Sequence, residues 1–138
     1  MDRVQIDLVQ STFAQIAPIA DIAAGLFYDD LFNRDPSLRL LFADDLTEQR
    51  QKLMQMLGAA VDGLDDWEAT VPVVRALGER HAGYGVLPEH FDTVGAALIG
   101  TLEKGLGEDF TPQVKDAWER CYGLVAGEMR SVLGAAAG

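Results

Sequence analysis

The stretch WEATVPVVRALGERH, residues 67–81, decides the fold that this sequence predicts. Trp67, Val71 and Val74 follow one another at steps of three and four residues, which is the spacing of one face of an α-helix. His81 continues this series two turns later. The pattern therefore predicts a helix whose buried face carries an imidazole where leucine would be the ordinary residue.

A buried imidazole needs a partner, because polar groups away from water are costly when they make no hydrogen bond. One alternative for His81 is another protein group. The other is a metal, and the metal that best suits an otherwise apolar helical pocket is haem iron held by one axial histidine. The spacing of the residues alone leaves both alternatives open.

The rest of the chain also predicts helices, because no stretch keeps a strict two-residue alternation and glycine or proline interrupts it at helical lengths. We expect one all-α domain over residues 1–138, with seven or eight helices of unequal length and a frayed tail at 134–138. Such unequal lengths disfavour a symmetric four-helix bundle. Ile22 is expected on a buried helix face over 19–33.

Helix starts are also visible in the sequence. Asp35-Pro36 and Thr111-Pro112 combine a capping side chain with a proline, which suits the first helical position. Thr47 is a further candidate N-cap.

The composition excludes several classes of partner. The 138 residues carry a formal net charge of −11, which repels the phosphates of nucleic acids and of anionic membranes. The chain has no apolar run of about eighteen residues and no visible secretory signal. Cys121 is alone, so it offers neither a disulfide nor a thiolate cluster. We therefore expect a cytoplasmic protein with no nucleic-acid partner and no membrane insertion.

Three further residues are candidates for a pocket. Gln49 lies one turn before Leu53 on an apolar face, where its amide either stays half exposed and caps a group or donates to a ligand. Tyr28 lies at the edge of a buried face, so its hydroxyl meets water or points into a cavity. Phe42 either fills the core or walls in a flat cofactor.

Other polar residues give no catalytic pattern. The adjacent acids at 29–30, 44–45 and 65–66 do not converge from one helix face, and we interpret them as solvated. His90 follows a proline at a helix start and is expected at the surface. No nucleophile–base motif and no phosphate-binding glycine loop is present in the sequence.

Taken together, the sequence resembles the bacterial single-domain globins of the Vitreoscilla type and the haem domain of flavohaemoglobins. The resemblance covers nearly the whole chain. It is carried, in order and without large gaps, by Phe27-Tyr28, Leu31-Phe32, Asp35-Pro36, Leu41-Phe42, Gln49, Lys52-Leu53, His81, Ala117-Trp118 and Tyr122-Gly123.

The resemblance implies a globin fold around haem b, iron protoporphyrin IX. It implies that His81 is the proximal ligand of the iron and that Phe42 packs on the porphyrin. Tyr28 and Gln49 match the distal pair that contacts bound oxygen, and Leu53 matches the apolar distal residue one turn further on.

Lys52 and Arg80 are candidates for the haem propionates, on their charge and position alone. Two positions depart from the flavohaemoglobin pattern. Phe91 stands where a tyrosine would support the proximal histidine, and Leu133 stands where a glutamate would. The polar network that makes this ligand more anionic is therefore expected to be missing.

The resemblance implies a haem protein that binds dioxygen reversibly for storage, transport or sensing, and other diatomic ligands such as NO or CO. The iron would be five-coordinate or weakly ligated on the distal side. A nitric-oxide dioxygenase is the alternative, and it would depend on an external reductase because the sequence carries no flavin or nicotinamide motif. A haem-free globin-like signalling or structural module is the alternative from another class. The departures at Phe91 and Leu133 favour oxygen binding over oxygen activation.

Overall fold

The computed structural model describes residues 1–83, 87 and 89–137, and for residues 81–83 and 133–137 it describes the helical backbone only. The described residues form six α-helices and four short 3₁₀-helices and contain no strand, which confirms the all-α prediction. In chain order the elements are α1 (Arg3–Ile16), η1 (Ala17–Ile19), α2 (Ala20–Arg34), η2 (Pro36–Leu41), α3 (Thr47–Asp62), η3 (Gly63–Asp66), α4 (Trp67–Gly83), α5 (His90–Leu106), η4 (Gly107–Asp109) and α6 (Pro112–Ala137).

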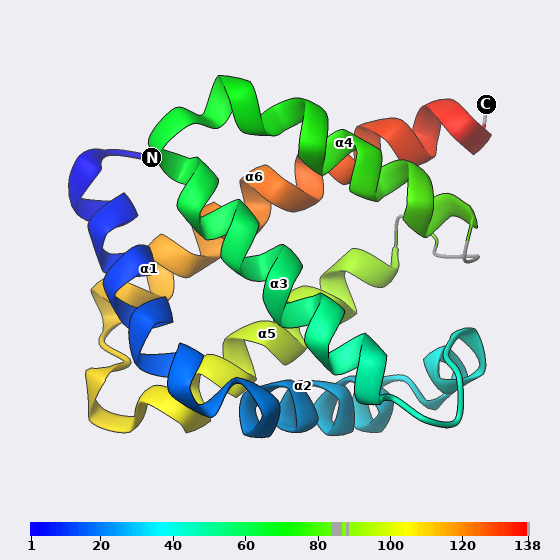
Figure 1. Cartoon of the computed structure of the whole chain (residues 1–138), viewed down its shortest axis with the longest axis horizontal. Coiled ribbons are helices and arrows are strands. Elements are labelled where there is room, and N and C mark those ends of the chain that lie inside the picture. The colour runs from blue at the N-terminus through cyan, green and yellow to red at the C-terminus, as the bar shows by residue number, and fades with distance from the viewer. Residues whose placement is uncertain (84–86, 88, 138) are drawn as a thin grey trace.

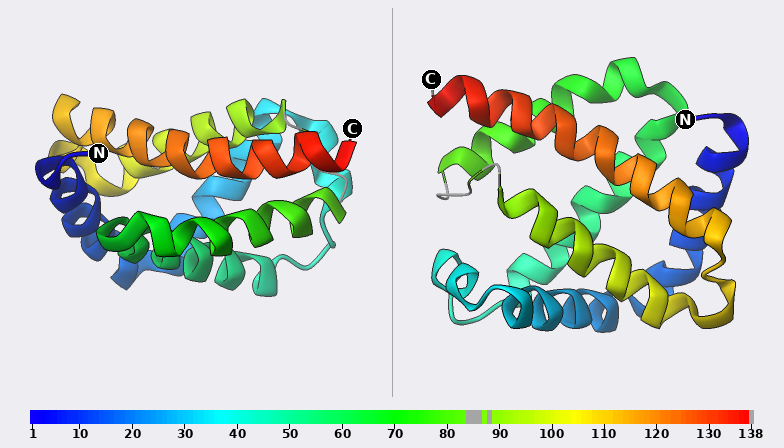
Figure 2. Two further views of the ribbon diagram at one scale, coloured as in Figure 1. Left: turned by 90° about the horizontal axis from the view of Figure 1, so that it is seen from above. Right: turned by 180° about the vertical axis from the view of Figure 1, so that it is seen from behind.

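The long helices are arranged in two layers. Helices α5 and α6 form one layer, and α3 and α4 form the other (Figure 2). Helices α1 and α2 lie along two adjacent edges (Figure 1). The most extensive contacts join α4 to α6 and α2 to α5. Element η2, the first turns of α3 and the last turns of α4 lie toward the same side of the molecule, on the right in Figure 1.

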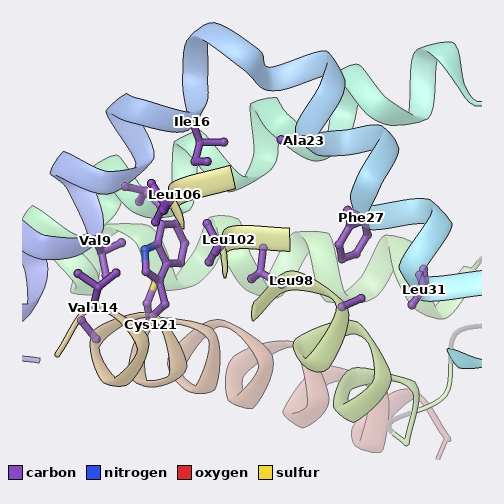
Figure 3. Close-up of a cluster of buried hydrophobic side chains, with 14 of the residues drawn as sticks. Val9, Ile16, Ala23, Phe27, Leu31, Leu98, Leu102, Leu106, Val114 and Cys121 are labelled. Atoms are coloured by element: carbon purple, nitrogen blue, oxygen red, sulfur yellow. The ribbon is translucent and has the colours of Figure 1, made fainter. Parts of the chain in front are cut away.

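The main core joins α1, α2, α5 and α6. Its buried side chains include Val9, Ile16, Phe27, Leu31, Leu98, Leu102, Leu106, Val114 and Cys121 (Figure 3). Full burial of one such aliphatic or aromatic side chain contributes roughly 1.5–3 kcal/mol. These contacts therefore supply the main driving force that fixes the four helices against one another.

A buried polar pair docks α1 on α6. Trp118 is completely buried, and its indole N–H donates to the hydroxyl of Thr12 at 2.8 Å. The Thr12 hydroxyl in turn donates to the carbonyl of Leu8 at 2.6 Å. Both buried polar groups are thus satisfied, as an interior site requires.

The two cap-plus-proline starts are confirmed. The Asp35 carboxylate accepts from the backbone N–H of Ser37 at 3.1 Å, and Pro36 is the first residue of η2. The Thr111 hydroxyl accepts from the N–H of Val114 at 3.2 Å where α6 begins.

Two local predictions are wrong. Ile22 is 63% exposed, because the face of α2 that packs on the core runs instead through Ala23 and Phe27. Thr47 does not cap α3 but is its first residue. The Asp45 carboxylate accepts from the backbone N–H of Thr47 at 2.9 Å and from its hydroxyl at 2.7 Å, so Asp45 serves the helix start.

Three further features complete the fold. Pro72 lies inside α4, five residues after its start. Helix α6 extends to Ala137 and so includes most of residues 134–138, the tail for which we predicted fraying. Whether these residues fray stays a prediction. Within the part of the chain that the structure describes, no helix is both long and apolar enough to cross a membrane.

Candidate functional site

The structure brings Tyr28 and Gln49 together. Tyr28 lies on α2 and is only 3% exposed, whereas Gln49 lies half-buried in the first turn of α3. The amide Nε2 of Gln49 donates a hydrogen bond to the hydroxyl oxygen of Tyr28 at 3.1 Å. Of the alternatives for Tyr28, the buried hydroxyl with a polar partner is therefore the one observed.

This hydrogen bond leaves the proton of Tyr28 available. The phenol oxygen accepts from Gln49, so its own O–H can donate to another group. Burial raises the pKa of Tyr28, and the hydrogen bond from Gln49 offsets part of that rise. The hydroxyl thus stays protonated at neutral pH, as a hydrogen-bond donor must.

Aromatic rings surround the Tyr28 phenol. The ring of Phe42, which follows η2, meets Tyr28 edge-on at a centroid distance of 5.5 Å. Phe32 contacts both, at 5.9 Å from Tyr28 and 5.5 Å from Phe42, and Phe27 stands edge-on to Tyr28 at 5.0 Å. Such edge-to-face arrangements are the favoured geometry for aromatic rings. The hydroxyl and amide are therefore set in an apolar wall; below, Tyr28, Phe42 and Gln49 are called the distal wall.

The structure gives the exposure of Leu53, Lys52 and Arg80, and their predicted roles toward haem stay predictions. Leu53 is half-buried and packs against the main core one turn after Gln49. Lys52 on α3 and Arg80 on α4 are exposed, and neither forms an ion pair with another described residue. Both cations are therefore open to solvent, one on α3 and one on α4.

The backbone of His81 lies in the last turn of α4, but its side chain is outside the described residues. The side chain of Leu133 is outside them as well. The predicted roles of both side chains therefore stay predictions. The placement of α4 itself is described, and it depends on contacts with α6.

Helix α4 approaches α6 closely one turn before His81. A Cβ atom at Gly78 would lie 3.0 Å from the Cα of Met129 and 3.1 Å from its carbonyl oxygen. One turn earlier, the Arg75 guanidinium pairs with the Glu128 carboxylate at 2.8 Å. The spacing of the two helices is thus set by backbone contact, which a side chain at residue 78 would oppose.

The sequence analysis missed a role for Tyr122. Its hydroxyl donates to the backbone carbonyl of Phe91 at 2.6 Å and so ties α6 to the first turn of α5. Gly95 makes room for the ring, because a Cβ there would lie 2.7 Å from the Tyr122 Cε2 atom. Burial raises the pKa of Tyr122, which keeps this donor protonated. Its only sequence signal was the Tyr122-Gly123 pair in the resemblance.

Phe91 is buried at the predicted position beside α4. It belongs to a small apolar cluster with Val74, Ala126 and Met129. The Arg130 guanidinium lies 5.6 Å from the centroid of its ring. The expected loss of polar support for His81 stays a prediction, because the side chain of His81 is outside the described residues.

Other candidate groups do not converge on the distal wall. His90 accepts a local hydrogen bond from the N–H of Leu87 at 3.0 Å. Among the described residues, no group of three histidine, cysteine, aspartate or glutamate side chains could hold a metal ion. A surface groove of about 580 Å³ lies between α5 and α6, and neither Tyr28 nor Gln49 lines it. The candidate site is therefore the distal wall and not this groove.

The distal wall fits one side of a flat, largely apolar cofactor. The wall supplies aromatic rings for the face of such a cofactor and two polar groups for a small ligand. The chemistry of this side is therefore compatible with the group that the resemblance implied, whereas the parts of Lys52 and Arg80 stay predictions.

Comparison with known proteins places the chain among relatives. The family model described as "Globin" matches residues 25–129. A flavohemoprotein of Bacillus subtilis is 31% identical over 131 residues, which cover 91% of this chain and 32% of that protein. A flavohemoprotein of Bordetella parapertussis is 31% identical over 137 residues, covering 94% and 34%. The chain thus spans about a third of the length of these curated relatives.

Two solved structures share the fold. A bacterial globin from Campylobacter jejuni has a TM-score of 0.86 at 21% identity, covering 99% of both chains. A carbene transferase, engineered from a candidate nitric oxide dioxygenase of Rhodothermus marinus, has a TM-score of 0.88 at 23% identity, covering 99% of this chain and 96% of that one. The expected globin fold is confirmed, and with the family model matching most of its length the chain belongs to the globin family.

Proposed function

We propose that the protein binds haem b and, with it, dioxygen reversibly. The observation that carries this proposal is the part-buried hydrogen bond from Gln49 to Tyr28, in which the phenol oxygen accepts and its own O–H is left to donate elsewhere. Globin-family membership and the flavohemoprotein relatives support it further. When bound, the haem iron supplies an open coordination position for a diatomic ligand.

The proposal assigns a part to each predicted residue. His81 would hold the group from α4 through one ring nitrogen, and a hydrogen bond from the other nitrogen to a carbonyl would fix the orientation of the ring. Phe42 and Leu53 pack on its faces and exclude water. Lys52 and Arg80 bind its acidic substituents at the exposed rim.

Tyr28 is the residue that stabilises the ligand. A phenolic donor in apolar surroundings stabilises a diatomic ligand that takes up partial negative charge by about 1.5–3 kcal/mol. Gln49 orients the phenol by donating to its oxygen, so the O–H need not turn back toward the amide. The two residues act as a unit, with Tyr28 as donor and Gln49 as its support.

The proximal side favours binding over activation. Phe91 offers no hydroxyl near α4, so the imidazole of His81 lacks one of the two polar supports that the flavohaemoglobin pattern would supply. A less anionic axial ligand donates less electron density and gives weaker cleavage of bound ligands. This contrast is the reason for placing reversible binding ahead of catalysis.

Nitric-oxide dioxygenase activity is the second candidate, favoured by the flavohemoprotein relatives and the Rhodothermus neighbour. Repeated turnover would need a reductase that returns the haem iron to its ferrous form. Mixing the oxygenated protein with nitric oxide and then supplying a reductase tests this candidate. Nitrate formed over repeated turnovers supports it, whereas failure to form one nitrate per haem or to recycle leaves reversible binding.

Absorption spectra of the purified protein, reconstituted with haem b, test the leading proposal. We expect a Soret band that shifts among the ferric, ferrous and oxygenated forms. His81→Ala should lose haem at least about tenfold faster, because it removes the axial ligand. His90→Ala is the matched control, since the only other histidine accepts a local bond from Leu87. A wild-type protein without a Soret band would refute the proposal and support the haem-free module.

A further inference from the structure

The connection between η2 and α3, residues 42–46, carries Phe42 into the distal wall. It has no regular secondary structure, and Phe42 itself is in extended backbone conformation, with φ −120° and ψ 155°. Its carbonyl groups therefore need partners other than a helix or a sheet. The segment is also short, so a partner for its carbonyls restricts both Phe42 and the start of α3.

A single guanidinium supplies those partners. Nη1 of Arg39 donates to the carbonyl of Ala43 at 2.8 Å and, at the longer distance of 3.5 Å, to that of Phe42. Nη2 donates to the carbonyl of Asp44 at 2.9 Å. Three successive carbonyls thus point at one planar fork of donors, a geometry that the arginine side chain provides and lysine does not.

The same guanidinium lies on the aromatic side of the connection. Its Cζ atom is 5.3 Å from the centroid of Phe32, and Phe32 meets both Phe42 and Tyr28. A cation over an aromatic face at this distance is attracted by the ring. Arg39 therefore packs on Phe32, which lies against two residues of the distal wall, while it holds the backbone that carries Phe42.

The far end of the connection is tied as well. Asp45 accepts from the backbone N–H and hydroxyl of Thr47, two residues before Gln49. Arg39 and Asp45 between them fix the segment from Phe42 to the first turn of α3. A change in this segment would move Phe42 and Gln49 together relative to Tyr28.

We propose that Arg39 is a positioning residue of the distal wall, which closes the 42–46 connection by clamping its carbonyls and so keeps Phe42 and Gln49 against Tyr28. The effect on bound haem rests on the proposed function, whereas the effect on the connection does not. The alternative is that Arg39 contributes only its positive charge. In that case Arg39→Lys would leave the connection and the distal wall unchanged.

The first test measures the connection without haem. An acid-specific endopeptidase can cleave after Asp44 or Asp45 only when this segment opens locally. We expect Arg39→Met and Arg39→Lys to raise the cleavage rate about tenfold each, since loss of one hydrogen bond from a charged group changes an opening equilibrium by about that factor. Arg120→Met is the control, because Arg120 is an exposed α6 residue paired only with Asp116 at 3.5 Å.

The second test measures the distal wall in the haem-loaded protein. Both Arg39 variants should release haem to an acceptor protein about tenfold faster and shift the C–O stretching band of the carbon monoxide form, while Arg120→Met keeps the wild-type band. Unchanged cleavage in Arg39→Met would overturn the proposal, as would wild-type behaviour of Arg39→Lys. Failure of the wild-type chain to bind haem would instead contradict the proposed function, because the cleavage test is independent of haem.

Discussion

The two sides of the candidate pocket are held by different kinds of contact. The distal wall depends on side chains that meet one another, with Gln49 donating to Tyr28 and Phe42 edge-on to the phenol. On the α4 side, helices meet at glycines, with Gly78 against the backbone of Met129 and Gly95 against a tyrosine ring. We therefore expect a change of one polar atom to alter the distal wall, whereas the α4 side should be altered by changes in the distance between helices.

The largest expected effect comes from adding a methyl group between α5 and α6. In Gly95→Ala the new Cβ would lie 2.7 Å from the Tyr122 ring, which cannot swing aside without losing its bond to the Phe91 carbonyl. We expect the free energy of unfolding to fall by about 2 kcal/mol. Denaturant unfolding measures this change.

Gly127→Ala provides the matched control, because nothing lies within 4 Å of a Cβ built at that α6 position. This variant should raise the free energy of unfolding by about 0.5–1 kcal/mol through helix propensity. Equal changes in the two variants would show that helix spacing at Gly95 is not restrictive.

The next effect isolates the distal donor. Tyr28→Phe removes the phenolic O–H but keeps the ring that packs on Phe42. We expect oxygen to dissociate roughly tenfold faster, equivalent to about 1.4 kcal/mol, measured by stopped-flow mixing. Tyr122→Phe makes the same chemical change on the other side, and a similar acceleration there would contradict the division between the two sides.

A smaller effect is expected on stability from Tyr122. Tyr122→Phe leaves the Phe91 carbonyl without the 2.6 Å bond from α6. The free energy of unfolding should fall by about 1 kcal/mol, the usual contribution of one hydrogen bond. Calorimetric or denaturant unfolding checks this value, and an unchanged midpoint would mean that water replaces the hydroxyl without loss.

The smallest expected effect is a loss of stability at alkaline pH, where Tyr122 ionises. Burial raises the pKa of Tyr122 above the value of roughly 10 that it has in the unfolded chain. The folded state therefore binds this proton more tightly, so its contribution is fully present below about pH 10 and declines as the pH rises further. The gap between unfolding midpoints at about pH 8 and about pH 11 should narrow in Tyr122→Phe, with a remainder from Tyr28 and Cys121, whose pKa values burial also raises. An unchanged gap would assign the whole decline to other groups.

The periodicity of the sequence predicted the helices, whereas the pairing of Tyr28 with Gln49 was implied only by the resemblance to globins. It could not predict contacts that depend on how distant helices cross. Trp118 finds its hydroxyl partner in Thr12, which lies 106 residues earlier. Ile22 and Ala23 have similar local settings, and only the contact with neighbouring helices decides that Ala23 is buried.

The polar contacts of loops were missed for a related reason. Arg39 binds carbonyl groups, which every residue carries, so no residue type marks its targets in the sequence. Asp45 rather than Thr47 serves the start of α3, because both residue types suit a helix start and only backbone geometry distinguishes them. Such contacts become visible only when the path of the chain is known.

The bond from Tyr122 has a consequence for how position 91 can vary in evolution. Its acceptor is a main-chain oxygen, which persists whatever side chain residue 91 carries. A single-nucleotide exchange of tyrosine for phenylalanine at this position can therefore change the polarity beside α4 while the junction between α5 and α6 stays intact. The side chain at position 91 and the bond that joins α5 to α6 can thus change independently of one another.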